Sequence, residues 1–228
     1  MSLRYQLLIF DWDGTLMNSV ARIVSCMQQS AADCLLPIPD AVAIHDIIGL
    51  SLRTAIPRLF PCVPDATVER LLARYREHYL HLDTTPTPLF PGVESQLQAW
   101  HNSGYQLAVA TGKARAGLDR VLLETGLGSL FASTRGADEA RSKPDPLMLE
   151  QILKQLDVPV SQAVMVGDSI HDMAMAQALG MDRIGITWGV HGPQQLQAHG
   201  PVTIVDNLDE LAGYLSSTQV MTVTAEAE

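Results

Sequence analysis

The feature that most constrains the fold of this 228-residue chain is an alternation of short strand-like runs with helix-like segments. It begins at Leu7 and resumes after Pro91. Short apolar runs rich in β-branched residues are typical of buried strands. Strands that alternate with helices form a parallel sheet with helices on both faces. We therefore predict an α/β fold with a doubly wound parallel sheet, whose strands are 7–10, 106–110, 130–134, 163–166, 183–187 and 202–205.

A second pattern separates the first strand-like run from the others. Apolar residues recur at helical spacing over 17–35 and again from Asp65 to Leu82, with no strand-like run between them. A proline-rich stretch, Thr84–Pro88, follows and is typical of a stiff linker. We expect an inserted all-helical domain over 17–86 and an α/β core domain formed by 1–16 and 87–228.

Composition narrows the partners. The formal net charge is −10, which argues against nucleic acid or an acidic membrane surface, since both require a basic face. No run approaches membrane-spanning length and no signal peptide is visible, so we expect a cytoplasmic protein. A substrate that is itself anionic would have to be met by local positive charge, such as a metal or a few placed cations. We expect a monomer or a homodimer.

Acidic and polar residues follow three of the predicted strands. Because ligands of such sheets bind beyond the carboxyl ends of the strands, these residues should meet at one rim. Carboxylate oxygens suit Mg²⁺ bound beside a phosphate, while a lysine and a hydroxyl can contact phosphoryl oxygens. The sequence therefore predicts a magnesium and phosphate site formed by Asp11, Asp13, Thr111, Gly112, Lys143, Asp168 and Asp172.

These residues, in this order, resemble the four motifs of the haloacid dehalogenase superfamily. The motifs are Asp11-Trp12-Asp13-Gly14-Thr15, Thr111-Gly112, Lys143-Pro144 and Gly167-Asp168-Ser169-Ile170-His171-Asp172. The helical insertion directly after the first motif resembles the C1 cap of that superfamily. The resemblance covers essentially the whole chain and implies a core of the α/β type with a cap over its active site.

The resemblance also implies a role for each residue. Asp11 would be the nucleophile that forms an aspartyl-phosphate, and Asp13 the general acid and then the general base. Mg²⁺ would be held by Asp11, the backbone carbonyl of Asp13 and Asp168, with Asp172 nearby. The remaining three would serve the phosphoryl group: Thr111 and the Gly112 N–H by binding its oxygens, and Lys143 by offsetting its charge.

Within the superfamily the chain is most similar to phosphatases of the phosphoglycolate type, which implies a small phosphorylated metabolite as its partner. Dehalogenases lack an acid at Asp13, phosphonatases need a cap lysine that 17–86 does not contain, and P-type ATPases need membrane spans. The segment Thr187-Trp188-Gly189 supports the phosphatase group, although Thr111-Gly112-Lys113 replaces the usual Thr-Asn-Lys. Two alternatives stay open: a phosphomutase of the β-phosphoglucomutase type, and a catalytically idle binding protein on the same fold.

The predicted cap contributes one further candidate. The segment Ile47–Arg53 resembles the substrate-specificity loop of C1 caps, so Arg53 is a candidate partner for a substrate carboxylate or second phosphate. The pairs His45-Asp46 and His171-Asp172 resemble metal-binding dipeptides, but both lie in helical stretches and we expect solvent-facing histidines. His191 follows the late tryptophan segment near the predicted rim, and we expect an ordinary loop residue there.

Overall fold

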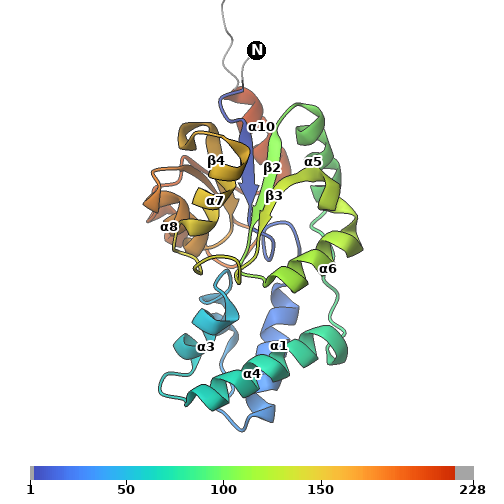
Figure 1. Cartoon of the computed structure of the whole chain (residues 1–228), viewed down its shortest axis with the longest axis vertical. Helices are drawn as coiled ribbons and strands as arrows, with labels where there is room; N and C mark the ends of the chain where they lie inside the picture. The colour runs from blue at the N-terminus through green and yellow to red at the C-terminus, as the bar shows by residue number, and fades with distance from the viewer. Residues whose placement is uncertain (1–2, 219–228) are drawn as a thin grey trace, which may run out of the picture.

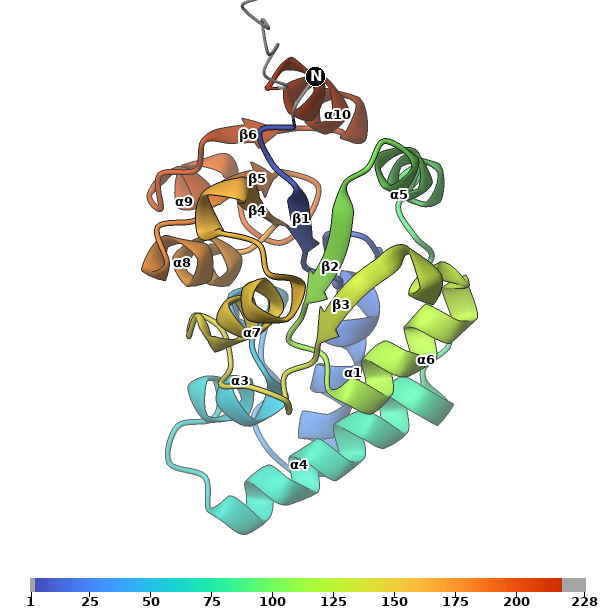
Figure 2. The same cartoon turned by 45° about the horizontal axis from the view of Figure 1, so that its top comes forward.

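The computed structural model describes residues 3–218 and contains a six-stranded parallel sheet with helices on both faces (Figures 1 and 2). The strand order is β3-β2-β1-β4-β5-β6, the order of doubly wound nucleotide-binding sheets. The predicted fold class is confirmed. The strands are β1 (Leu7–Phe10), β2 (Gln106–Ala110), β3 (Phe131–Arg135), β4 (Ala163–Gly167), β5 (Asp182–Ile186) and β6 (Thr203–Val205).

Alternate residues of each central strand face opposite sides of the sheet, and each side has its own hydrophobic cluster. Leu8 and Phe10 of β1 belong to one cluster, with α5 (Val93–Asn102), α6 (Arg115–Thr125) and α10 (Leu208–Ser217). Leu7 and Ile9 belong to the other, with α7 (Leu147–Leu156) and α8 (Ile170–Ala178). This period of two explains why β1 is an unbroken apolar run. Shorter helices complete the α/β part: η2 (Leu127–Leu130), η3 (Val160–Gln162) and α9 (Pro193–Gln197).

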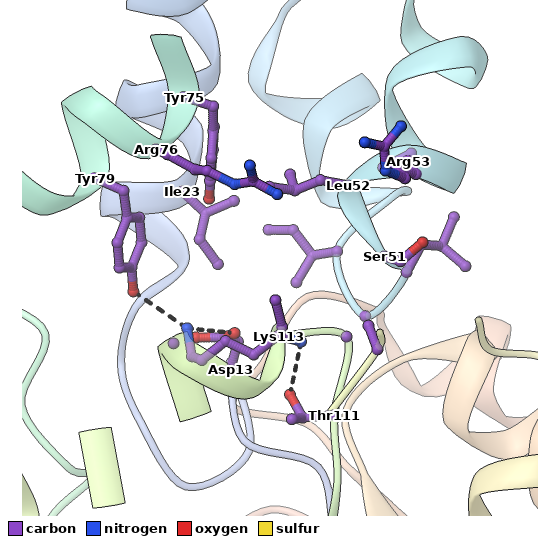
Figure 3. Close-up of a pocket in the computed structure, with 18 of the residues that line it drawn as sticks. Asp13, Ile23, Ser51, Leu52, Arg53, Tyr75, Arg76, Tyr79, Thr111 and Lys113 are labelled. Carbon is purple, nitrogen blue, oxygen red and sulfur yellow. Dashed lines mark hydrogen bonds and ion pairs between the residues drawn. The ribbon is translucent and has the colours of Figure 1, made fainter. Parts of the chain in front are cut away.

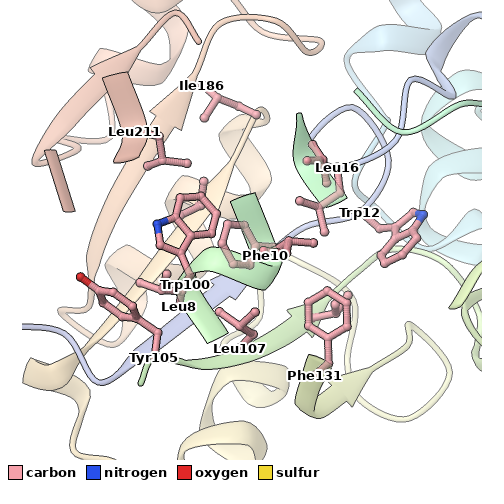
Figure 4. Close-up of a cluster of buried hydrophobic side chains, with 14 of the residues drawn as sticks. Leu8, Phe10, Trp12, Leu16, Trp100, Tyr105, Leu107, Phe131, Ile186 and Leu211 are labelled. Atoms are coloured by element: carbon pink, nitrogen blue, oxygen red, sulfur yellow. The ribbon is translucent and has the colours of Figure 1, made fainter. Parts of the chain in front are cut away.

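The aromatic residues concentrate on the first of these faces (Figure 4). Phe10 stacks on Trp100 with ring centroids 5.6 Å apart, and Trp12 meets the edge of Phe131 at 6.2 Å. Burying a large apolar side chain contributes about 1.5–3 kcal/mol. Trp12, between the two acids of the first motif, is therefore anchored in the core, and this fixes the strand end that carries them.

The chain between β1 and α5 is helical and lies at one end of the α/β part (Figure 1). The buried apolar side chains of residues 20–82 form a third cluster that shares no buried member with the other two. We propose that this helical part is the cap domain expected over 17–86. The expected core domain, 1–16 and 87–228, extends at both ends beyond the described residues 3–218. The cap helices are α1 (Val20–Asp33), α2 (Ala41–His45), α3 (Leu52–Leu59), α4 (Asp65–Glu77) and η1 (His78–Leu82).

The helix predicted from Asp65 runs to Leu82, but its last turn, η1, is a π-helix. Such widened turns are rare and frequently lie at functional sites. Here the wider turn carries Tyr79, which is buried and stacks on Tyr75 of α4 with ring centroids 5.9 Å apart. Within 3–218 no helix combines the length and apolar character that crossing a bilayer requires.

Candidate active site

Three carboxylates converge where β1 and β4 end. Phe10 lies opposite Val166 in the parallel register, so Asp11 and Asp168 follow the ends of neighbouring strands. Asp172 lies in the first turn of α8 and approaches the same point. All three side chains are buried, and each offers an oxygen within 4.8 Å of the others. The structure thus brings these predicted metal ligands together.

Lys143 joins this centre from the loop before α7 and is fully buried. Its Nζ lies 2.9 Å from Oδ1 of Asp11 and 2.6 Å from Oδ1 of Asp172. Burial alone would lower the pKa of Lys143, but the two carboxylates outweigh it and raise that pKa. A buried charge is tolerated only when it is paired. Lys143 is therefore an ammonium that neutralises part of the acidic centre.

One ammonium does not balance three carboxylates. Burial, followed by the neighbouring charge of Asp172, raises the pKa of Asp168 to about 7. Burial also raises the pKa of Asp11 well above its usual value, although Lys143 opposes the rise. The centre therefore has an excess of negative charge, which a divalent cation would relieve.

Two hydrogen bonds and close packing hold the carboxylate of Asp168 in place. Thr15 Oγ1 donates to Oδ1 at 2.7 Å, and the Val190 N–H donates to Oδ2 at 2.9 Å. A Cβ on Gly14 would lie 2.2 Å from Asp168 Oδ2, and one on Gly189 would lie 2.1 Å from the Asp168 Cβ. Both glycines are therefore required by close packing. This gives a physical reason for the Thr187-Trp188-Gly189 segment that the sequence singled out.

The donor set fits a magnesium ion. Oδ2 of Asp11 is buried and has no hydrogen-bond partner within 3–218, although its other oxygen accepts from the Trp12 N–H at 2.7 Å. Mg²⁺ prefers carboxylate and carbonyl oxygens. The Asp13 carboxylate is not among the three converging acids. Asp13 could therefore bind the ion only through its backbone carbonyl, as the resemblance implies.

Asp13 has a cation of its own (Figure 3). Its Oδ2 lies 2.9 Å from Nζ of Lys113, and its Oδ1 accepts a 2.6 Å hydrogen bond from Ser19 Oγ. Lys113 also donates to the Tyr79 hydroxyl at 3.4 Å. Burial would lower the pKa of Lys113, but Asp13 reverses this and raises it. The two acids of the first motif thus lie in separate electrostatic environments, one with Lys143 and one with Lys113.

Thr111 and Gly112 follow β2 at the same rim, as predicted. Thr111 is buried, and its Oγ1 accepts from the Lys113 N–H at 3.2 Å. A Cβ on Gly112 would lie 2.5 Å from the carbonyl oxygen of Gly49 and 2.7 Å from that of Leu50. The departure from Thr-Asn-Lys therefore has a steric reason: a cap loop occupies the space that an asparagine would need.

A cavity of about 460 Å³ opens between this rim and the cap helices. Asp11, Asp13 and Thr111 line its inner end, and residues of α1, α3, α4, η1 and α6, with the loop 47–51, line most of the rest. Arg53 also lines the cavity, but its exposed guanidinium is ion-paired with the exposed Glu69. Arg53 would therefore meet a substrate anion only by exchanging that partner.

Two histidines differ from the expectation. His171 was expected to face solvent, but it is buried and its Nε2 lies 2.8 Å from the Asp46 carbonyl oxygen, so that prediction is wrong. His191 is also buried rather than an ordinary loop residue, with Nε2 3.7 Å from Asp46 Oδ1. Burial lowers the pKa of both rings. Both rings contact Asp46, directly after α2, and so link this part of the cap to the core. No periodicity in the sequence could indicate these contacts.

Sequence reasoning also missed the residues around Asp13. Lys113, Ser19 and Tyr79 were not identified as members of the site. The scarcity of lysine, with three in the whole chain, was an available signal for Lys113. Ser19 and Tyr79 carried no signal, because each is an ordinary residue of a helical segment until the cap folds over β1.

Comparison with known families and structures agrees with this geometry. Residues 8–186 match the family described as haloacid dehalogenase-like hydrolase, and the chain belongs to this family. "Probable phosphatase IndB" from Dickeya dadantii is 38% identical over 91% of this chain and 92% of its own length. A phosphoglycolate phosphatase from Cupriavidus necator is 31% identical over 96% and 97%, respectively. The predicted superfamily and the predicted enzyme class, a phosphatase, are confirmed.

Solved structures show the same fold. A hydrolase from Pseudomonas syringae has a TM-score of 0.84 at 22% identity and covers 94% of this chain and 100% of its own. A haloacid dehalogenase-like family hydrolase from Streptococcus pneumoniae has a TM-score of 0.80 at 24% identity and covers 92% and 98%. At these identities the likeness concerns the fold and leaves the substrate open.

Proposed function

We propose that the protein is a Mg²⁺-dependent phosphatase of small phosphomonoesters that acts through an aspartyl-phosphate on Asp11. The observation that carries the proposal is that two neighbouring acids lie in different electrostatic environments. Asp11 lies inside the acidic centre beside Lys143, whereas Asp13 lies at the cavity with Lys113 and Ser19. A nucleophile and a proton donor need different environments on either side of the reacting phosphorus.

In the first step, the Asp11 carboxylate attacks phosphorus and the bond from phosphorus to the ester oxygen breaks. Asp13 donates its proton to that leaving oxygen, and the alcohol departs. In the second step, Asp13 takes a proton from water, whose oxygen attacks phosphorus. The bond to Asp11 breaks, inorganic phosphate leaves and both acids return to their starting states. One residue serves both steps because the leaving alcohol and the entering water occupy the same place.

The other residues manage charge. Asp11, Asp168 and the backbone carbonyl of Asp13 would hold the magnesium ion, with Asp172 nearby. When bound, the ion supplies positive charge that allows a carboxylate to approach an anionic phosphate. Thr111 Oγ1 and the Gly112 N–H would bind phosphoryl oxygens. Lys143 offsets the charge on Asp11 and on the phosphoryl group.

The relatives named phosphoglycolate phosphatases make that ester the first compound to test. Arg53 remains the predicted partner of its carboxylate, subject to the exchange with Glu69 described above. A phosphomutase would use the same acids on a sugar phosphate, and an idle binding protein would use none. The conversion of a sugar 1-phosphate to the 6-phosphate without phosphate release would identify the mutase.

Phosphate release from p-nitrophenyl phosphate tests the proposal. We expect release that depends on Mg²⁺ and is abolished by Asp11→Asn. Asp182→Asn is the matched control, because Asp182 is an acid at the start of β5, remote from the cavity. Its activity should equal that of the wild type. Failure to release phosphate from any monoester in the presence of Mg²⁺ would refute the phosphatase.

A further inference from the structure

The cavity changes character with distance from the acids. Beyond Asp11 and Asp13 the surface of the wall is mainly apolar, and aliphatic side chains of the cap supply a large part of it. Polar metabolites gain little from such a surface, whereas apolar groups gain in proportion to the area they bury. The main aliphatic residues are Ile23, Met27, Ile48, Leu50, Leu52 and Leu72.

The cations at this cavity offer little to a second substrate anion. Lys113 is paired with Asp13, Arg53 with Glu69, and Arg120 with Glu124 at 3.3 Å. Arg76 is exposed, so water screens its charge. Among residues 3–218, the cavity therefore has no buried cation without an acidic partner. A short substrate with a carboxylate beside its phosphate finds no complementary charge deep inside.

One polar group in the wall lacks a partner. The side chain of Tyr75 is 8% exposed and stacks on Tyr79, yet its hydroxyl makes no hydrogen bond within residues 3–218. Figure 3 shows both tyrosines directed from the cap towards Lys113. The hydroxyl is not among the fully enclosed polar atoms that lack a partner, so it is open to the cavity, where a ligand can accept its hydrogen bond. Burial raises the pKa of Tyr75 well above its usual value, so the hydroxyl keeps its proton and can donate it.

From these observations we infer that the substrate is a phosphate monoester of an alcohol with a bulky, mainly apolar body. That body lies against the Tyr75–Tyr79 pair and the aliphatic wall, and carries a hydrogen-bond acceptor for the Tyr75 hydroxyl. The inference rests on the proposed phosphatase and narrows its substrate. It sets the natural substrate apart from two-carbon acids and from sugar phosphates, whose hydroxyls would be left unpaired at aliphatic side chains.

Esters with similar alkyl leaving groups test the inference without bias from leaving-group reactivity. We would compare 2-phenylethyl phosphate, 2-(4-acetylphenyl)ethyl phosphate, phosphoglycolate and glucose 6-phosphate with Mg²⁺, by phosphate release. We expect kcat/KM for both aryl esters to exceed those for phosphoglycolate and glucose 6-phosphate at least about tenfold. Equal values, or a preference for either polar ester, would overturn the inference and leave the phosphatase intact. No release from any ester would instead refute the phosphatase.

Tyr75→Phe tests the hydroxyl separately, because it keeps the stacked ring. We expect the ratio of kcat/KM for the acetyl ester to that for the phenyl ester to fall about five- to tenfold, the effect of one hydrogen bond. Tyr214→Phe in α10 is the matched control, a phenol outside the cavity, and should keep the wild-type ratio. An unchanged ratio in Tyr75→Phe would remove the hydroxyl from substrate recognition.

Discussion

The inner end of the cavity is formed by buried charged groups, whereas its outer end is formed mainly by apolar side chains. At the inner end, Asp11, Asp168, Asp172 and Lys143 are almost fully buried, and fixed ion pairs and backbone N–H groups hold them. At the outer end the wall is mainly aliphatic and aromatic, and two of its arginines, Arg53 and Arg120, pair with acids near the surface. In the proposed function, the inner end performs the reaction and the outer end selects the alcohol whose phosphate ester enters it.

The two ends of the cavity also come mainly from different parts of the chain, the sheet and the cap. Strand ends of the sheet supply Asp11, Thr111 and Asp168 to the inner end, and hydrogen-bonded neighbouring strands set the position of the main chain there. The first turn of α8 and the loop before α7 add Asp172 and Lys143. Helix faces of the cap supply the outer end, where side-chain size and shape decide the surface. Variation in the cap can thus change the substrate without disturbing the chemistry. The following substitutions and conditions test this division, in order of decreasing effect.

Lys143→Met should have the largest effect. It leaves three buried carboxylates without their ammonium, so phosphate release should fall at least about a thousandfold. Without Mg²⁺, the free energy of unfolding in urea should fall by about 3–5 kcal/mol, the usual effect of breaking a buried pair. Lys154→Met, at an exposed lysine of α7, is the control and should change neither. Wild-type stability in Lys143→Met would show that the carboxylates do not need this cation.

Magnesium should stabilise the protein through the inner end. At 100 times its dissociation constant, a ligand adds about 2.7 kcal/mol, which raises the Tm of a chain this size by about 5–10 °C. We expect this rise at pH 8 by differential scanning fluorimetry, and its loss in Asp168→Asn. Asp182→Asn should retain the rise, and an equal rise in Asp168→Asn would place the ion elsewhere.

The same centre predicts a pH dependence without the metal. Because the pKa of Asp168 is raised to about 7 in the folded state, the folded protein binds more protons than the unfolded chain between pH about 4 and 7. The contribution of Asp168 to stability therefore falls as pH rises through that window. Urea unfolding of the metal-free protein should show this fall, and Asp168→Asn should reduce it. If the free energy of unfolding changed with pH to the same extent in the wild type and in Asp168→Asn, that result would contradict the assignment.

Gly112→Ala probes the junction of the two ends. Its Cβ would meet the Gly49 and Leu50 carbonyl oxygens at 2.5 and 2.7 Å, so the cap loop must move. A displacement of this size can reduce kcat/KM by up to about a hundredfold. Gly213→Ala in α10, where a Cβ would meet nothing within 4 Å, should keep full activity. Full activity in Gly112→Ala would mean that contact between the cap loop and the core is not needed for turnover.

Arg53→Ala should have the smallest effect. The side chain is exposed and paired with an exposed acid, and surface substitutions of this kind seldom matter. For 2-phenylethyl phosphate we expect kcat/KM within about threefold of the wild type. A much larger loss confined to phosphoglycolate would instead support the sequence-based prediction that Arg53 binds a substrate carboxylate.

The sequence was informative where the fold leaves side chains little choice. Asp11, Thr111 and Asp168 follow strands, so a correct strand prediction and the parallel topology were enough to bring them to one rim. The cap surface was different. Tyr75 and Tyr79 fit the apolar stripe of a helix, and nothing local shows that the stripe continues into the cavity.

Tertiary packing decided the remaining positions. The burial of His171 depends on a carbonyl 125 residues earlier in the chain. The glycine at 112 depends on the position of a cap loop. Neither relation leaves a periodic trace in a single sequence, so both became visible only when the cap and the core were placed together.

The most direct test of the account is chemical trapping of the phosphorylated enzyme. Wild-type protein mixed with Mg²⁺ and 2-phenylethyl phosphate would be quenched rapidly and reduced with borohydride, which converts an aspartyl-phosphate to homoserine. Peptide mass spectrometry would then locate the change. The account predicts homoserine at position 11, dependent on substrate and Mg²⁺ and absent from position 13. Continued turnover with no modification at Asp11, or modification of a different carboxylate, would contradict it.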